Sequence, residues 1–160
     1  MTIFLRLLGL ILLLNVIRYI VAGPIEQLTV LPDLFEMMAA NASYFNTSFD
    51  AVDWITSFLY NGVMWAVAVI TFHWMHPQLA GGWFIKSLKA YGLACLFFVS
   101  VSAIYMNHYS HPATFYLYNM GSGAIAFTVV AVANAWLYPR LVVGRTHPSA
   151  EPASMEGGSR

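Results

Sequence analysis

The chain has 160 residues, of which 59% are hydrophobic and only 9% are charged. Soluble domains usually carry about 25% charged residues, so this composition excludes an ordinary water-soluble protein. Seven basic and seven acidic residues give a net charge of zero. No basic cluster could follow a phosphate backbone, so we expect no nucleic acid partner. The single cysteine, Cys95, excludes a disulfide framework or a thiol-exchange pair within the chain.

The first apolar stretch covers residues 3–22. A basic start followed by an apolar run is also typical of a signal peptide. Three features favour a retained helix instead: the run is long, Arg18 lies where a cleavage region should be neutral, and Pro24 follows the only plausible cut. We therefore predict that residues 3–22 form a first membrane-spanning helix.

An acidic segment, residues 24–53, follows this stretch and contains no lysine or arginine. We predict that it is an extracytoplasmic loop. Its carboxylates are Glu26, Asp33, Glu36, Asp50 and Asp53.

Two local patterns predict structure inside this loop. Apolar residues recur at i, i+3, i+4 and i+7, which is typical of one face of a helix, and they predict a short helix along the outer membrane surface. Thr47 and Asp50 fit a capping box that begins the second long helix. The recurring apolar residues are Leu31, Leu34, Phe35 and Met38.

Three further apolar stretches cover residues 54–74, 83–107 and 113–137. At about 1.5 Å per residue, each is long enough to cross roughly 30 Å of hydrocarbon. The predicted fold is thus an all-α integral membrane protein, a four-transmembrane-helix bundle formed by residues 1–143. Residues 144–160 are rich in proline, glycine and small polar residues, and we predict a disordered cytoplasmic tail.

Basic residues gather on one side if the four helices alternate in direction, and only Arg18 lies toward the other side. The positive-inside rule assigns the basic side to the cytoplasm. We therefore expect both chain ends inside and a multi-pass protein of a bacterial inner (plasma) membrane. The residues on the basic side are Arg6, Lys86, Lys89, Arg140, Arg145 and Arg160.

Each predicted span places an amide or a guanidinium in its outer half. Polar groups in hydrocarbon are costly unless they are paired, so a shared pocket open to the outside is an economical arrangement. It would be a binding site or an ion path, with Arg18 paired to a loop carboxylate or to an anionic ligand. The alternative is a set of interhelical hydrogen bonds, each worth about 1 kcal/mol or less. The candidate pocket residues are Asn15, Arg18, Asn61, Asn107 and Asn119.

Two histidine pairs have i, i+3 spacing, which can place two imidazoles on one metal ion. His73 and His76 end the second span, whereas His108 and His111 end the third, about 30 Å away across the membrane. We expect the inner pair to be interfacial. The outer pair, completed by loop carboxylates, could bind zinc or copper; neither pair has the opposed arrangement that a bis-histidine haem needs.

No motif connects the chain to a named reaction. The first hypothesis is a non-enzymatic role, either as a subunit of a larger membrane complex or as a homo-oligomer that binds or transports a small solute or ion. Its immediate partner is the lipid bilayer, and it requires no cofactor. The alternative is a membrane-embedded metal-binding or redox enzyme component that uses His108, His111 and the loop carboxylates.

Overall fold

The structure is a computed structural model that describes residues 2–144. Within this range it contains helices and no strand, which confirms the all-α prediction. Residues 145–160 of the predicted disordered tail lie outside the described residues. The stretches long and apolar enough to cross a membrane are Ile3–Thr29, Ala51–Met75, Trp83–His108 and Ala113–Val143.

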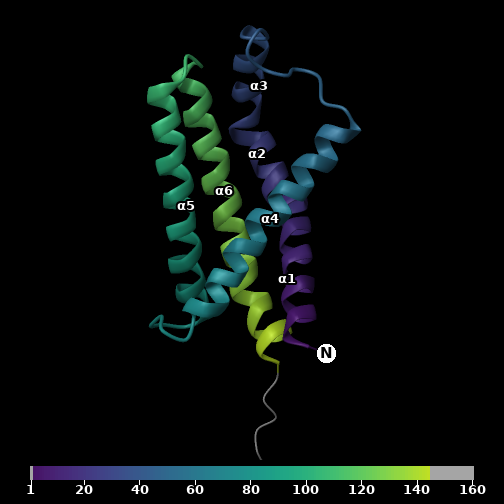
Figure 1. The fold of residues 1–160 in the computed structure, drawn as a ribbon, viewed down its shortest axis with the longest axis vertical. Coiled ribbons are helices and arrows are strands. Elements are labelled where there is room, and N and C mark those ends of the chain that lie inside the picture. Colours follow the sequence, from purple (N-terminus) through teal and green to yellow (C-terminus); the bar gives the residue numbers. More distant parts are fainter. Residues whose placement is uncertain (1, 145–160) are drawn as a thin grey trace, which may run out of the picture.

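The helices form a bundle in which α5 (Trp83–His108) and α6 (Ala113–Tyr138) make an antiparallel hairpin. Helix α1 (Ile3–Ile17) packs against α6 and against α4 (Ala51–Met75). Figure 1 shows that α4 crosses the bundle obliquely, so that its beginning lies away from the α5–α6 hairpin.

The two ends of the bundle differ in charge. The N-terminus, the α4–α5 turn and the end of α6 lie together at one end (Figure 1). We call this the basic end because Arg6 and Lys86 lie there, and we call the opposite end, which carries Asp33 and Asp50, the acidic end.

The buried core lies toward the basic end. There, all four long helices contribute fully buried side chains, whereas the first part of α4, residues 51–62, contains no buried residue. Helix α4 therefore leaves the core as it runs toward the acidic end, and this leaves an opening among the helices. The largest buried core side chains are Leu10, Leu14, Trp65, Phe72, Tyr91 and Tyr138.

Large apolar side chains also cover the outside of the bundle. Leu12, Val63, Phe97 and Leu117 are all more than half exposed. A soluble protein rarely leaves such a continuous apolar surface open to water. This surface is the one expected of helices whose solvent is lipid.

The first helix extends further than predicted. Helix α1 continues through a π-helical turn, η1 (Arg18–Ala22), into α2 (Gly23–Thr29). Pro24 does not end the helix because the wider turn precedes it: the Gly23 N–H donates to the Arg18 carbonyl, five residues earlier. The wider turn relieves the clash that a proline ring makes with the carbonyl four residues before it.

The predicted loop, residues 24–53, is consequently helical over much of its length. Helix α3 (Leu31–Ala40) confirms that the periodic apolar residues form a helix. It buries Leu34, packs against α6 and continues the direction of α2 (Figure 1).

The predicted capping box of Thr47 and Asp50 is wrong by three residues. Asp50 is itself the N-cap of α4 and accepts from the backbone N–H groups of Val52 and Asp53, at 2.8 and 3.0 Å. The Asp53 side chain accepts in return from the Asp50 N–H at 3.1 Å. Asp53 thus occupies the position, three residues after the N-cap, where a capping box usually has glutamate or glutamine. The helix begins at Ala51.

At the basic end, the histidines of α4 pack among aromatic rings. His73 Nδ1 lies 2.5 Å from the Tyr138 hydroxyl. The ring of His76 lies 5.1 Å from that of Tyr138 and 5.4 Å from that of Trp83, and the His76 carbonyl accepts from Lys86 Nζ at 2.8 Å. The imidazoles therefore tie the end of α4 to α5 and α6.

This packing predicts a pH dependence of stability. Burial, followed by the charges of His73 and Lys86, lowers the pKa of His76 below its usual value. The unfolded chain then binds a proton more readily than the folded one, so stability is complete above about pH 7 and falls as the pH drops through the usual histidine range. We expect the unfolding midpoint in detergent to fall on acidification, and His76→Gln to reduce this slope; an unchanged slope would contradict the assignment.

Candidate functional site

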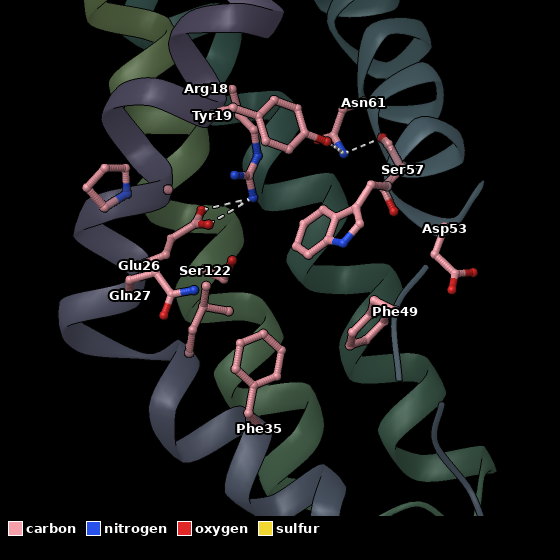
Figure 2. A pocket seen from close by; sticks show the side chains of 14 residues that line it. Arg18, Tyr19, Glu26, Gln27, Phe35, Phe49, Asp53, Ser57, Asn61 and Ser122 are labelled. Carbon is pink, nitrogen blue, oxygen red and sulfur yellow. Dashed lines mark hydrogen bonds and ion pairs between the residues drawn. The ribbon is translucent and has the colours of Figure 1, made fainter. Parts of the chain in front are cut away.

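The opening beside α4 forms a cavity of about 490 Å³ in the acidic half of the bundle. Its walls come from η1, α2 and α3 on one side, from α4 on the other, and from Ser122 of α6. Figure 2 shows the polar side chains directed into the space between these elements. We call this space the outer cavity; polar residues that line it include Arg18, Tyr19, Glu26, Gln27, Ser57 and Asn61.

An ion pair forms one wall of the outer cavity. Arg18 Nη2 donates to both carboxylate oxygens of Glu26, at 3.1 and 2.9 Å. The Glu26 side chain is only 1% exposed and that of Arg18 is 17% exposed. Arg18 Nε is buried and has no hydrogen-bond partner within the described residues. Within the described residues, the ion pair thus occupies only the Nη2 atom of the guanidinium.

The π-helical turn brings these two residues onto one face. In an uninterrupted α-helix, residues eight apart lie about 80° apart around the axis, but one extra residue in a π turn reduces the difference to about 20°. Arg18 and Glu26 therefore point to the same side, two turns apart, where their side chains meet. The turn that accommodates Pro24 also builds the ion pair.

Across the cavity, Asn61 joins α4 to the first helix. Its Nδ2 donates to the Tyr19 hydroxyl at 3.2 Å and to the Ser57 carbonyl at 2.8 Å. The Arg18 guanidinium lies 4.9 Å from the centre of the Tyr19 ring, a cation–π distance. Tyr19 is thus held between the charged wall and the amide wall.

A second space, of about 300 Å³, lies deeper in the bundle. It shares Arg18, Asn61 and Ser122 with the outer cavity and adds Asn119 of α6 and Phe98 of α5. We call it the deep cavity. The two cavities together have lining residues from all four long helical stretches.

The structure brings together three of the five predicted pocket residues. Arg18, Asn61 and Asn119 all line the deep cavity. Asn15 does not line either cavity; it is 1% exposed and donates from Nδ2 to the Phe58 carbonyl at 3.1 Å. Asn107 is exposed and is not among the residues lining these cavities. Asn15 therefore joins α1 to α4, as the alternative of interhelical hydrogen bonds predicted.

Most residues that line the outer cavity were not predicted as pocket residues. Glu26 was counted among the carboxylates of the predicted loop, because the apolar stretch ends at Ala22. Tyr19, Ser57 and Gln27 line the outer cavity beside it. Tyr19 lies four residues before Gly23, and Ser57 lies four residues before Asn61. Residues at this spacing share one face of a helix, so the sequence could have placed both side chains beside a small or polar residue.

Another polar pair was also missed, and it serves packing. Asn134 Nδ2 donates to Ser87 Oγ at 3.0 Å, and Ser87 Oγ donates to the Ala131 carbonyl at 2.7 Å. Both side chains are fully buried between α5 and α6. Unlike the Arg18–Glu26 ion pair, the Ser87–Asn134 pair lines neither the outer cavity nor the deep cavity.

The predicted metal residues lie at the acidic end. His108 is exposed, and its Nδ1 lies 2.8 Å from the Ile104 carbonyl of its own helix. His111 packs against the rings of Phe45 and Tyr109. Among residues 2–144, no group of three or more histidine, cysteine or acidic side chains is placed to hold a metal. Zinc or copper binding stays a prediction from sequence spacing.

Comparison with known protein families, with curated proteins and with solved structures found no match to this chain.

Proposed function

We propose that this chain is a non-enzymatic, four-span protein of a bacterial inner (plasma) membrane that binds a small polar solute from the outer side. The ion pair beside the two cavities carries this proposal. Charged groups within a span are costly and commonly mark a ligand or ion path. A pair that served packing alone would be surrounded closely, as Ser87 and Asn134 are, whereas Arg18 lines about 490 Å³ of space.

In this proposal, the basic end faces the cytoplasm and α3 lies at the outer surface. The distribution of lysine and arginine supports this orientation. Helix length supports the position of α3, because the 27 residues of Ile3–Thr29 already extend about 40 Å and exceed the roughly 30 Å of hydrocarbon. The outer cavity then opens toward the periplasm.

Thiol labelling in intact cells tests the orientation. With Cys95 replaced by alanine, we introduce Glu36→Cys at the acidic end or Lys89→Cys at the basic end; both positions are exposed. A membrane-impermeant maleimide is expected to label the first variant in intact cells and the second only after permeabilisation. The opposite pattern would reverse the orientation.

Access of water to the site is tested with Ser122→Cys, because Ser122 lines both cavities. In the same cysteine-free background, a positively charged, membrane-impermeant methanethiosulfonate added outside should modify this thiol, since Glu26 is neutralised by Arg18, and Asp53 leaves a negative charge at the cavity. Ser87→Cys is the matched control, because Ser87 is fully buried between helices. Equal protection of both thiols would contradict an open binding site.

We further propose that copies of this chain associate with one another or with other membrane subunits. The small residues of α6 are partly used within the bundle: a Cβ on Gly123 would overlap the ring of Phe98. Gly121 and Ala124 flank this contact on the same helix. Purification in mild detergent with mass measurement of the assembly tests the proposal, and a protein that remains monomeric without partners would contradict it.

A further inference from the structure

A third space adjoins the two polar cavities. It is a groove of about 680 Å³ between α4 and α5, and its exposed lining is almost entirely apolar. We call it the apolar groove. Small residues on the facing sides, Ala68 of α4 with Ala90 and Ala94 of α5, provide its width. Thr71 is the one polar side chain among its lining residues.

The three spaces lie next to one another. The outer and deep cavities share Arg18, Asn61 and Ser122. The deep cavity and the apolar groove share Met64, Phe98 and Phe127. Each space therefore adjoins the next along single side chains, within the reach of one long amphiphile.

Chemical character changes in order along this series. The outer cavity is lined by charged groups, namely the Arg18–Glu26 pair and Asp53. The deep cavity shares Asn61 and Ser122 with the outer cavity and adds one more uncharged hydrogen-bonding group, Asn119. The apolar groove then offers aliphatic and aromatic surface only, apart from Thr71. A charged head, a neutral polar linker and a hydrocarbon chain match this order.

We propose that the solute of the proposed function is a membrane phospholipid with a zwitterionic head group, bound by its phosphate in the outer cavity and by one acyl chain in the apolar groove. This inference rests on the proposed function and specifies its ligand. The ester region of the lipid accepts hydrogen bonds from Asn119 and Ser122 in the deep cavity.

Charge complementarity favours a zwitterionic head group. The phosphate accepts from the guanidinium of Arg18, which lines both polar cavities and uses only Nη2 in its pair with Glu26. Arg18 is already neutralised by Glu26, and Asp53 adds a further carboxylate at the entrance. A zwitterionic lipid adds no net charge beside Asp53, and its ammonium group can pair with that carboxylate, whereas an anionic phospholipid adds a second uncompensated negative charge.

Any preference for one lipid over another must come from contacts with its head group. Lipid tails provide as apolar a surrounding as the groove itself, so an acyl chain gains little by entering it. A lipid without the charged head should therefore occupy the groove no more than it occupies the rest of the apolar surface.

Photo-crosslinking of the full chain in maltoside micelles tests this proposal. The probes are a phosphatidylethanolamine, a phosphatidylglycerol and a diacylglycerol, each with a diazirine on the same acyl chain. With the first, crosslinks are expected to concentrate on Val67, Leu93 and Phe97 in the groove. The phosphatidylglycerol should give fewer, and the diacylglycerol should show no preference over the lipid-facing surface.

Two variants separate chain binding from head-group binding. Ala94→Trp fills the groove and should abolish groove crosslinks, whereas Leu96→Trp on the exposed side of the same helix should retain them. The double variant Arg18→Gln/Glu26→Gln removes both charges and should abolish the preference for phosphatidylethanolamine. Retention on size-exclusion chromatography checks that each variant is folded.

Several outcomes would overturn the inference. Equal crosslinking of the diacylglycerol and phosphatidylethanolamine probes on the wild-type protein would show a groove that bulk lipid merely fills. Competition of the phosphatidylethanolamine signal by a neutral prenylated quinone, but not by unlabelled phosphatidylethanolamine, would assign the site to another amphiphile. If Ser122→Cys still reacts with the aqueous reagent in either case, binding of a polar solute stands while the phospholipid does not.

Discussion

Glu26→Gln is expected to destabilise the folded protein by about 3–5 kcal/mol, because it leaves the Arg18 guanidinium without its counter-charge inside the bundle. The Glu26 side chain is 1% exposed and both of its oxygens accept from Arg18 Nη2. Glutamine has nearly the same size as glutamate, so the variant preserves the packing and differs from the wild-type protein mainly in the charge at residue 26. Unfolding by increasing mole fraction of sodium dodecyl sulfate in mixed micelles measures the loss.

A double-mutant cycle separates the ion pair from ordinary packing. Arg18→Gln alone is expected to cost less than Glu26→Gln, because an isolated buried carboxyl can take up a proton whereas an arginine stays charged. The double variant Arg18→Gln/Glu26→Gln should recover most of the stability, since neither charge remains. Additive losses in the double variant would show that the two residues do not act as a pair.

Trp65→Ala is expected to cost about 2–4 kcal/mol, because Trp65 is fully buried at the point where α4 crosses the bundle. Its ring lies 5.2 Å from that of Phe127 in an edge-to-face arrangement. The estimate is below the usual range for large-to-small changes in water, since a bilayer provides apolar surroundings for the separated helices as well. The cost is therefore mainly that of the space left behind.

Trp65→Phe is the matched control for this change. The indole Nε1 is buried without a hydrogen-bond partner in the described part of the chain, so phenylalanine loses no hydrogen bond and retains the aromatic contact. We expect a loss well below that of the alanine variant in the same mixed-micelle titration. Equal losses would indicate that the indole nitrogen has a partner, such as water, that the protein does not itself supply.

The membrane-spanning stretches were predictable because each depends on a local property. A stretch of about 20 apolar residues spans hydrocarbon whatever its neighbours are, and residues 54–74, 83–107 and 113–137 all fall inside the helices α4, α5 and α6. The short helix α3 was predictable for a similar reason, since its apolar residues repeat with the helical period.

The end of the first helix was not predictable in the same way. The predicted span ended with the apolar stretch at Ala22. Proline disfavours the interior of a helix, yet the helix continues past Pro24 through the π turn. A partner for Arg18 was predicted among the loop carboxylates, but positions in a loop did not single out Glu26. The ion pair requires both the continued helix and the changed angular position of residue 26.

The sequence by itself determined that the chain is helical, that it is suited to lipid and that polar residues lie in its apolar stretches. Only the tertiary structure decided which of those residues meet: Asn15 packs between α1 and α4, whereas Asn119 lines a cavity with Arg18. The physical reason is that the rotation and tilt of a helix are set by contacts between residues far apart in the chain. Contacts such as Trp65 with Phe127 and Gly123 with Phe98 fix these angles, and no local pattern of hydropathy encodes them.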